Sequence, residues 1–338
     1  MAVVAVCCLL PLAYSVFHFG AHGSSSRSAP ATATATARAT ASRAHGSPVA
    51  SLALQVMPAP YQLPAPLSRE VALPAAGGLL LAGGLTAQGT STDAVTSLDP
   101  VTGGTRPAGR LAAATHDAAG AILGGQTYLF GGGTMASVPT VQAFAAGTAA
   151  GAAARGMVVG HLPAARSDAS GVTAGSVAYV IGGYDGTSWD PGVLATRDGQ
   201  HFRVVARLPV PVRYAAVAAG AGEIWVFGGQ APSGTTSAIQ RIDPATGRAT
   251  VVGHLLAPLQ GAVAIVLDGQ VYLAGGVAAG ATSQVVYRFD PATSSVSAVG
   301  QLPVPVAYAA GAVVGDVGYL VGGEVGRASC RERVSKQV

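Results

Sequence analysis

The chain has 338 residues, half of them hydrophobic and a tenth charged, and it is rich in glycine. Its net charge is +4, yet residues 47–326 carry 12 arginines against 14 aspartates and glutamates. The repeats are therefore slightly acidic, which argues against nucleic-acid binding. The single lysine is Lys336, so lysine Schiff-base chemistry is excluded in the repeats, and the lack of asparagine excludes N-glycosylation there. This residue usage is typical of a GC-rich bacterial genome.

An uncharged stretch, Ala2–Phe19, lies at the start of the chain. Its length predicts a membrane anchor or the apolar core of a signal peptide over residues 1–20. Residues 21–48 follow as an Ala/Thr/Ser-rich disordered linker that cannot bury a core. The linker arginines favour a cytoplasmic domain by the positive-inside rule, whereas such linkers also tether exported domains. We expect membrane contact through residues 2–19 and a domain on the extracytoplasmic face of the cell membrane, or secreted.

Six Gly-Gly pairs then recur, with their first glycines 46 to 51 residues apart. They are Gly83-Gly84, Gly131-Gly132, Gly182-Gly183, Gly228-Gly229, Gly275-Gly276 and Gly322-Gly323. Each pair ends a short apolar run such as Trp225-Val226-Phe227, where crowding or positive φ would exclude a side chain. A fixed period of this length, with strands ending in glycine, predicts a β-propeller whose structure depends on these glycines.

Each repeat contains signals for four strands. An Ala/Val-rich run precedes a hairpin turn such as Asp268-Gly269, and the strand after that turn ends at the glycine pair. A third strand, for example 285–289, runs into an Asp-Pro-x-Thr turn, and a fourth, for example 249–253, leads to a Leu-Pro element.

These residues resemble kelch repeats over roughly residues 49–324, although the tryptophan of the outer kelch strand is missing in most copies. The resemblance implies an all-β propeller of six or seven blades, each of four antiparallel strands. Six pairs favour six blades. Residues 51–56 fit the missing fourth strand of the last blade, whose first strands are Tyr308–Val314 and Gly318–Val321, so an N-terminal strand would close the ring.

The tail, residues 326–338, breaks the repeat. Residues 326–334 look like the translation of a sequencing-library adapter, so we expect a propeller over 49–325, a non-native tail, and a last blade whose third strand is missing. A disordered basic tail is the alternative. With the tail non-native, the propeller contains no cysteine.

One dipeptide stands at the start of each predicted inner strand, where side chains would converge at the mouth of the central channel. The dipeptides are Ser68-Arg69, His116-Asp117, Ser167-Asp168, Arg213-Tyr214, Gln260-Gly261 and Ala307-Tyr308. The members predicted to bind a ligand are Arg69, His116, Asp117, Asp168, Arg213, Tyr214, Gln260 and Tyr308. Solvated turn residues are the alternative.

The longest repeat carries Tyr184, Asp185, Trp189 and Asp190 on the same predicted face. An exposed aromatic ring beside paired carboxylates suits a sugar, whereas Trp189 capping the blade as core is the structural alternative.

Catalytic chemistry has less support. His116 is the one histidine at the predicted mouth, so no metal site is expected. Asp117 and Asp168 lie in adjacent repeats and could act as an acid/base pair. The copper site of galactose oxidase, another propeller, is not expected because the cysteine that it needs is missing, so no cofactor is predicted.

The sequence therefore favours a binding module for a glycan, peptide or protein over an enzyme. A carbohydrate-active epimerase or lyase using His116, Asp117, Asp168 and Arg213 remains the rival, and a sensor ectodomain is a third possibility.

Overall fold

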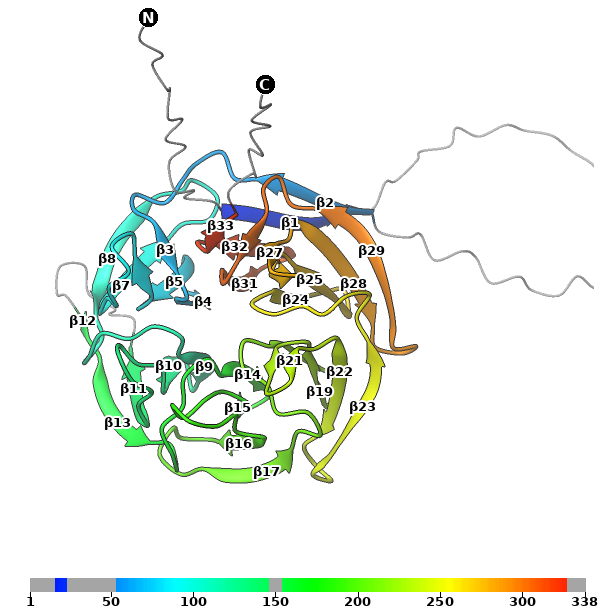
Figure 1. Cartoon of the computed structure of the whole chain (residues 1–338). Coiled ribbons are helices and arrows are strands. Elements are labelled where there is room, and N and C mark those ends of the chain that lie inside the picture. The colour runs from blue at the N-terminus through cyan, green and yellow to red at the C-terminus, as the bar shows by residue number, and fades with distance from the viewer. Residues whose placement is uncertain (1–15, 23–52, 146–153, 327–338) are drawn as a thin grey trace, which may run out of the picture.

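A computed structural model describes residues 16–22, 53–145 and 154–326 of the chain (Figure 1). Every regular element in these ranges is a β-strand. The described residues therefore include no helix that could cross a membrane. The sheets stand like blades around a central axis, and the chain is an all-β propeller. Three predicted segments lie wholly or partly outside the described ranges: residues 1–15 of the expected anchor, most of the linker, and the tail from residue 327.

Five sheets are each built mainly from one stretch of chain, with consecutive long strands paired antiparallel. From inside to outside, the two sheets nearest the C-terminus are β18 (Ala216–Gly220), β19 (Glu223–Phe227), β22 (Ala238–Asp243) and β23 (Arg248–His254), then β24 (Val263–Leu267), β25 (Gln270–Ala274), β28 (Val285–Asp290) and β29 (Ser295–Gln301). The Asp268-Gly269 turn joins β24 to β25 with both residues at positive φ, as its hairpin signal predicts.

The other three sheets follow the same plan. They contain β14 (Ser170–Ala174), β15 (Val177–Ile181), β16 (Gly192–Thr196) and β17 (Arg203–Arg207); β9 (Ala119–Leu123), β10 (Gln126–Phe130), β11 (Thr140–Phe144) and β13 (Met157–His161); and β4 (Val71–Ala75), β5 (Gly78–Ala82), β7 (Ala94–Leu98) and β8 (Thr105–Arg110). A short strand, β12 (Ala154–Arg155), pairs parallel with the outer edge of β8.

Short two-residue strands pair near the inner ends of the sheets. They are β3 (Leu67–Ser68) with β6 (Leu85–Thr86), β20 (Gln230–Ala231) with β21 (Gly234–Thr235), β26 (Val277–Ala278) with β27 (Ala281–Thr282), and β30 (Val306–Ala307) with β33 (Glu324–Val325).

A further four-stranded sheet combines segments that are distant in the sequence. Its order is β31 (Ala310–Val314), β32 (Val317–Val321), β1 (Val16–His22) and β2 (Ala53–Pro58). The expected N-terminal fourth strand corresponds to β2. The expected gap at the third strand is wrong: β1 pairs there, and a strand next to β32 satisfies backbone groups that would otherwise stay open. The boundary expected at residue 20 therefore lies inside a strand.

The glycine pairs allow neighbouring sheets to approach closely. In the pair Gly182-Gly183, φ is +64° and +103°, and the Gly183 N–H donates to the Val212 carbonyl of the segment that enters the next sheet (2.9 Å). A Cβ on Gly182 would overlap the same carbonyl oxygen. Apolar side chains such as Ile181 and Val226 then pack together between adjacent sheets.

Two buried glutamines fasten the segments that connect the sheets. Gln240 on β22 is fully buried, and its amide exchanges two hydrogen bonds of 2.9 Å with the Val210 backbone. Gln142 on β11 holds Ala113 in the same way. These connecting segments carry the residues at the centre of the ring, so the glutamines help to fix the geometry of that site.

Candidate functional site

Six residues form a hydrogen-bonded circle at the centre of the ring. Each has φ between 53° and 62°, in the left-handed region, and each backbone N–H donates to the carbonyl of its counterpart in the neighbouring repeat at 2.8–3.1 Å. The members are Arg69, Asp117, Asp168, Tyr214, Gly261 and Tyr308. We call them the mouth ring. Five of them carry side chains in a conformation that costs free energy, and such strain is concentrated at functional sites.

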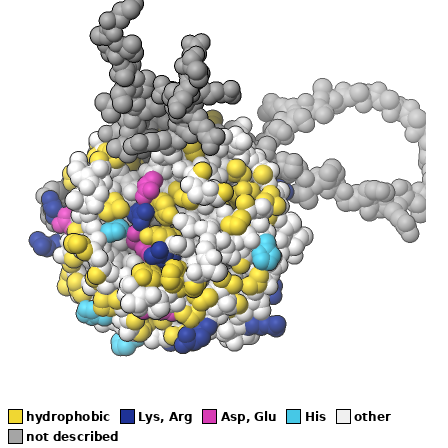
Figure 2. Space-filling view, viewed as in Figure 1, with side chains coloured by type: hydrophobic (Ala, Val, Ile, Leu, Met, Phe, Trp, Pro, Cys, Tyr) yellow, Lys and Arg dark blue, Asp and Glu magenta, His cyan; other side chains and the backbone are white. Residues whose placement is uncertain are grey.

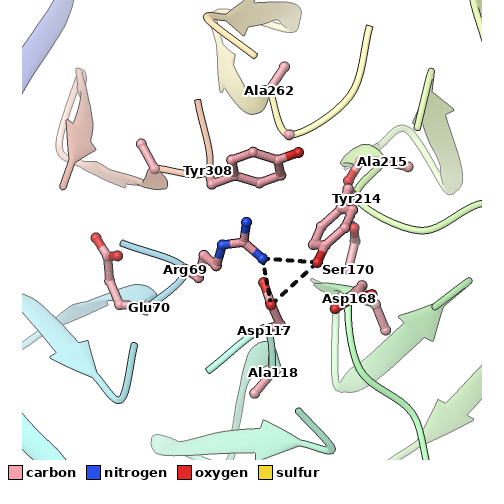
Figure 3. Close-up of a pocket in the computed structure, with 13 residues that line it drawn as sticks. Arg69, Glu70, Asp117, Ala118, Asp168, Ser170, Tyr214, Ala215, Ala262 and Tyr308 are labelled. Atoms are coloured by element: carbon pink, nitrogen blue, oxygen red, sulfur yellow. Dashed lines mark hydrogen bonds and ion pairs between the residues drawn. The ribbon is translucent and has the colours of Figure 1, made fainter. Parts of the chain in front are cut away.

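The mouth ring surrounds a pocket of about 120 Å³. Its walls include Ser170, Glu70 and the alanines that follow the ring residues (Figure 3). Figure 2 shows acidic, basic and histidine side chains gathered near the middle of this face, within a mostly uncharged and hydrophobic surface. The pocket is large enough for a side chain or a small polar group, and charged side chains and tyrosine rings both line it.

Arg69 lies across the pocket. Its guanidinium carbon is 4.4 Å from the Tyr308 ring centre and 5.5 Å from that of Tyr214. Nη1 donates to Asp117 Oδ2 (3.1 Å) and to the Tyr214 hydroxyl (3.0 Å), and Nε donates to Glu324 (3.0 Å). Burial lowers the pKa of Arg69, but Asp117, Tyr214 and Glu324 raise it more, so the guanidinium stays charged.

Arg213 makes the same kinds of contact as Arg69, with aromatic rings and an aspartate. It lies over the rings of Tyr184 (4.7 Å), Trp189 (5.3 Å) and Tyr214 (5.4 Å). It donates to Asp168 Oδ2 (3.2 Å) and to Gln230 Oε1 (2.9 Å). Two arginine–aspartate pairs thus alternate with aromatic rings, so the mouth presents donors, acceptors and flat apolar faces together.

The two aspartates, Asp117 and Asp168, lie in adjacent repeats and both line the pocket. Burial raises the pKa of Asp117 to about 7; the Arg69 charge opposes this shift and the Asp168 charge adds to it. Asp117 therefore holds or releases a proton near neutral pH. His116, whose Nε2 is 3.5 Å from Asp117, has its pKa lowered by burial and by the Arg69 charge, and its Nδ1 bonds Ser91 (2.8 Å).

Most of the candidates from the sequence meet at this site. Arg69, Asp117, Asp168, Tyr214 and Tyr308 line the pocket. The other candidates contact these pocket residues. Arg213, which lies over Tyr184 and Trp189, pairs with Asp168. His116 lies beside Asp117, and Gln260 donates to the Tyr308 hydroxyl (2.9 Å).

Asp185 does not point into the pocket. Its carboxylate accepts hydrogen bonds from the backbone and hydroxyl groups of Thr187 and Ser188 in its own turn, which lower its pKa. The neighbouring Asp190 pairs with the buried Arg166. Of the two carboxylates expected around Trp189, Asp185 therefore bonds its own turn and Asp190 bonds Arg166. Trp189 itself is half-buried against Tyr184 and Arg213.

Sequence reasoning missed Glu70, Ser170 and Glu324. Ser170 lines the pocket, and Glu324 pairs with Arg69. Glu70 follows Arg69 at a position where the other five repeats have alanine, and aligning the repeats would have revealed it. In the described residues there is no group of three His, Cys, Asp or Glu side chains that could hold a metal ion.

Comparison with known proteins agrees with this architecture. Residues 113–323, more than half of the chain, match the family described as the KLHDC2/KLHL20/DRC7 Kelch-repeats domain. A solved structure titled "Structure of YjhT" is similar with a TM-score of 0.65 and 15% identity, over 78% of this chain and 94% of that one. At that identity the likeness concerns the fold alone. No curated protein matches this chain.

Proposed function

Because this chain belongs to the KLHDC2/KLHL20/DRC7 Kelch-repeats family, a family of kelch propellers, we propose that it is a binding module whose ligand, a glycan, peptide or protein, is recognised at the mouth ring. The proposal rests on one observation: the strained ring residues direct charged and aromatic side chains from separate repeats into a single pocket. Elsewhere on the inner strands the residues are mainly alanine, valine and glycine.

Several features of the mouth support recognition rather than simple stabilisation. Arg69 and Arg213 each keep an Nη2 group with no hydrogen bond within the described residues. The other Arg69 nitrogens donate to Glu324, Asp117 and Tyr214, and those of Arg213 donate to Gln230 and Asp168. A side chain held in place by its neighbours, with a donor still free, is preorganised for a ligand acceptor. The tyrosine faces beside it add apolar contact.

Screening the purified full chain on glycan and peptide arrays would identify the class of ligand. Hydrogen exchange with the strongest hit bound should then slow at the mouth-ring amides of several repeats. Protection confined to the outer strands, or to the turns at the opposite end of the blades, would contradict the proposal. Separate glycan and peptide arms decide which ligand chemistry applies.

A second function is favoured by the titration of Asp117. A buried aspartate with a pKa of about 7, next to Asp168 and the Tyr214 hydroxyl, is suited to general acid/base chemistry on a sugar. Incubating candidate sugars with the protein in D2O and following them by NMR tests for epimerase or lyase activity. Turnover that Asp117→Asn abolishes would favour the enzyme, and absence of turnover with retained binding would favour the binding module.

We also propose that the sheet β31–β32–β1–β2 is a sixth blade that closes the ring. Support comes from the Arg69 N–H, which donates to the Tyr308 carbonyl (2.9 Å), and from contacts between β31 and β4. Deleting residues 1–22 removes β1 and should lower the melting temperature by several degrees, because the edge of β32 is then unpaired. An unchanged melting temperature would count against this closure.

A further inference from the structure

Glu70 differs from its counterparts in the other repeats. The residue after each mouth-ring residue is alanine in five repeats: Ala118, Ala169, Ala215, Ala262 and Ala309. In all six repeats the Cβ at this position packs against the second glycine of the repeat's own pair. Glu70 alone adds a carboxyl group to a site otherwise built for a methyl group.

That carboxyl group lies between the first and the last repeat. Glu70 is 7% exposed, and neither carboxylate oxygen has a hydrogen-bond partner that meets ordinary geometry. One oxygen lies beside Gly322 at the end of β32, where a Cβ on that glycine would overlap it. In Figure 3 the side chain points away from the pocket and from Arg69. We call this contact of β3 and β4 with β30, β31 and β32 the seam.

Other interactions cross the seam close to Glu70. The Arg69 N–H donates to the Tyr308 carbonyl (2.9 Å), the Gly323 N–H donates to the Leu67 carbonyl (2.9 Å), and Arg69 Nε pairs with Glu324 (3.0 Å). The titratable and charged groups here are Arg69, Glu324 and Tyr308, with Asp117 beyond them. All four belong to the mouth, and none of them bonds the Glu70 carboxyl.

A buried carboxyl group that lacks a hydrogen bond of ordinary geometry is favoured in its neutral form, since a poorly compensated charge in an apolar site is very unfavourable. Burial raises the pKa of Glu70 to about 8, and the backbone N–H groups of Glu70 and Ala310 only partly oppose this. Ionisation therefore requires that water reach the carboxylate, which lies against Gly322 at the seam.

We propose that Glu70 is a proton-operated latch: the seam stays closed while its carboxyl group is protonated and opens locally when the group ionises. Opening transfers Glu70 to water, where a glutamate has a pKa of about 4.3. The open fraction should then rise about tenfold per pH unit between about pH 4.3 and 8 and level off above that. Because Arg69 adjoins Glu70, opening would also disturb the mouth; that consequence rests on the proposed function, whereas the latch itself does not.

Hydrogen exchange of the full chain from pH 5 to 9, corrected for intrinsic rates, tests the latch without any ligand. The readout is the opening of the seam amides of Arg69 and Gly323, with the amides of Asp168 and Tyr214 at other junctions as internal references. Glu70→Ala reproduces the residue of the other five repeats, and Glu70→Gln keeps the shape without the charge. Glu324→Gln removes the other seam acid and serves as the matched control.

The wild type and Glu324→Gln should show seam opening that rises steeply with pH, by at least a hundredfold from pH 5 to 8, and both Glu70 variants should show a flat profile. A flat profile in the wild type would overturn the proposal. So would the same rise in the Glu70 variants, or an equal rise at the other junctions, which would indicate global unfolding rather than a latch.

Discussion

Replacing Gln240 by leucine removes the two hydrogen bonds that hold the Val210 backbone. Gln240 is fully buried, and both bonds measure 2.9 Å. The variant leaves a backbone N–H and a C=O without partners, and each orphaned buried group costs about 1–3 kcal/mol. Val210 is only partly buried, so water will satisfy part of the loss. We therefore expect a loss of about 2–3 kcal/mol, a large share of a typical total stability of about 5–15 kcal/mol.

Urea unfolding followed by tryptophan fluorescence measures this loss, because Trp225 is buried in the core. Gln284→Ala is the control: Gln284 bonds Gln301 on the exposed surface (3.0 Å), and its removal should change stability by less than about 0.5 kcal/mol. If the Gln240 variant unfolds at the same urea concentration as the wild type, the reasoning that these glutamines fasten the connecting segments fails.

Three further variants test the fold and its titrating groups. Gly182→Ala should cost at least about 2 kcal/mol more than Gly175→Ala by urea unfolding. Both glycines have φ near +60°, but only at Gly182 would the new Cβ overlap a carbonyl oxygen, that of Val212. Equal losses would refute the close-approach argument. Glu70→Gln should gain on the wild type by up to about 1.4 kcal/mol per pH unit as pH rises from about 4.3 to 8, since the raised pKa penalises the wild type over that window. Asp117→Asn should flatten the wild type's loss of thermal stability between about pH 4 and 7 for the same reason, and a parallel pair of melting curves across that range would contradict it.

Local signals in the sequence predict the blades well. The Asp268-Gly269 turn, the glycine pairs and the Asp-Pro-x-Thr turns each act through their own backbone, so they keep their meaning without tertiary information. Asp243 illustrates this: it accepts the Ala245 N–H (2.9 Å) and the Thr246 hydroxyl (2.7 Å), as its turn chemistry predicts. Counting from the Leu-Pro elements also placed the mouth-ring residues, because equal repeats put equal positions on the same circle.

What the sequence did not reveal depends on contacts between distant segments. Strand β1 pairs with β32, about 300 residues away, and nothing within Val16–His22 signals that partner. Asp185 was expected to face a ligand, but two neighbouring hydroxyl residues offered it nearer donors. Glu70 is buried because the last repeat packs against it, so its titration follows from tertiary structure alone.

The affinity of an Arg213→Ala variant for the strongest array ligand tests the central claim most directly. Arg213 contacts Tyr184, Trp189 and Asp168 at the mouth, whereas the control, Arg197→Ala, removes an exposed arginine that bonds Ser176 at the opposite end of its blade. We predict at least a tenfold loss of affinity in the first variant, equivalent to about 1.4 kcal/mol, and no change in the second. Unchanged affinity in Arg213→Ala, or a loss in Arg197→Ala instead, would show that the mouth is not the binding site.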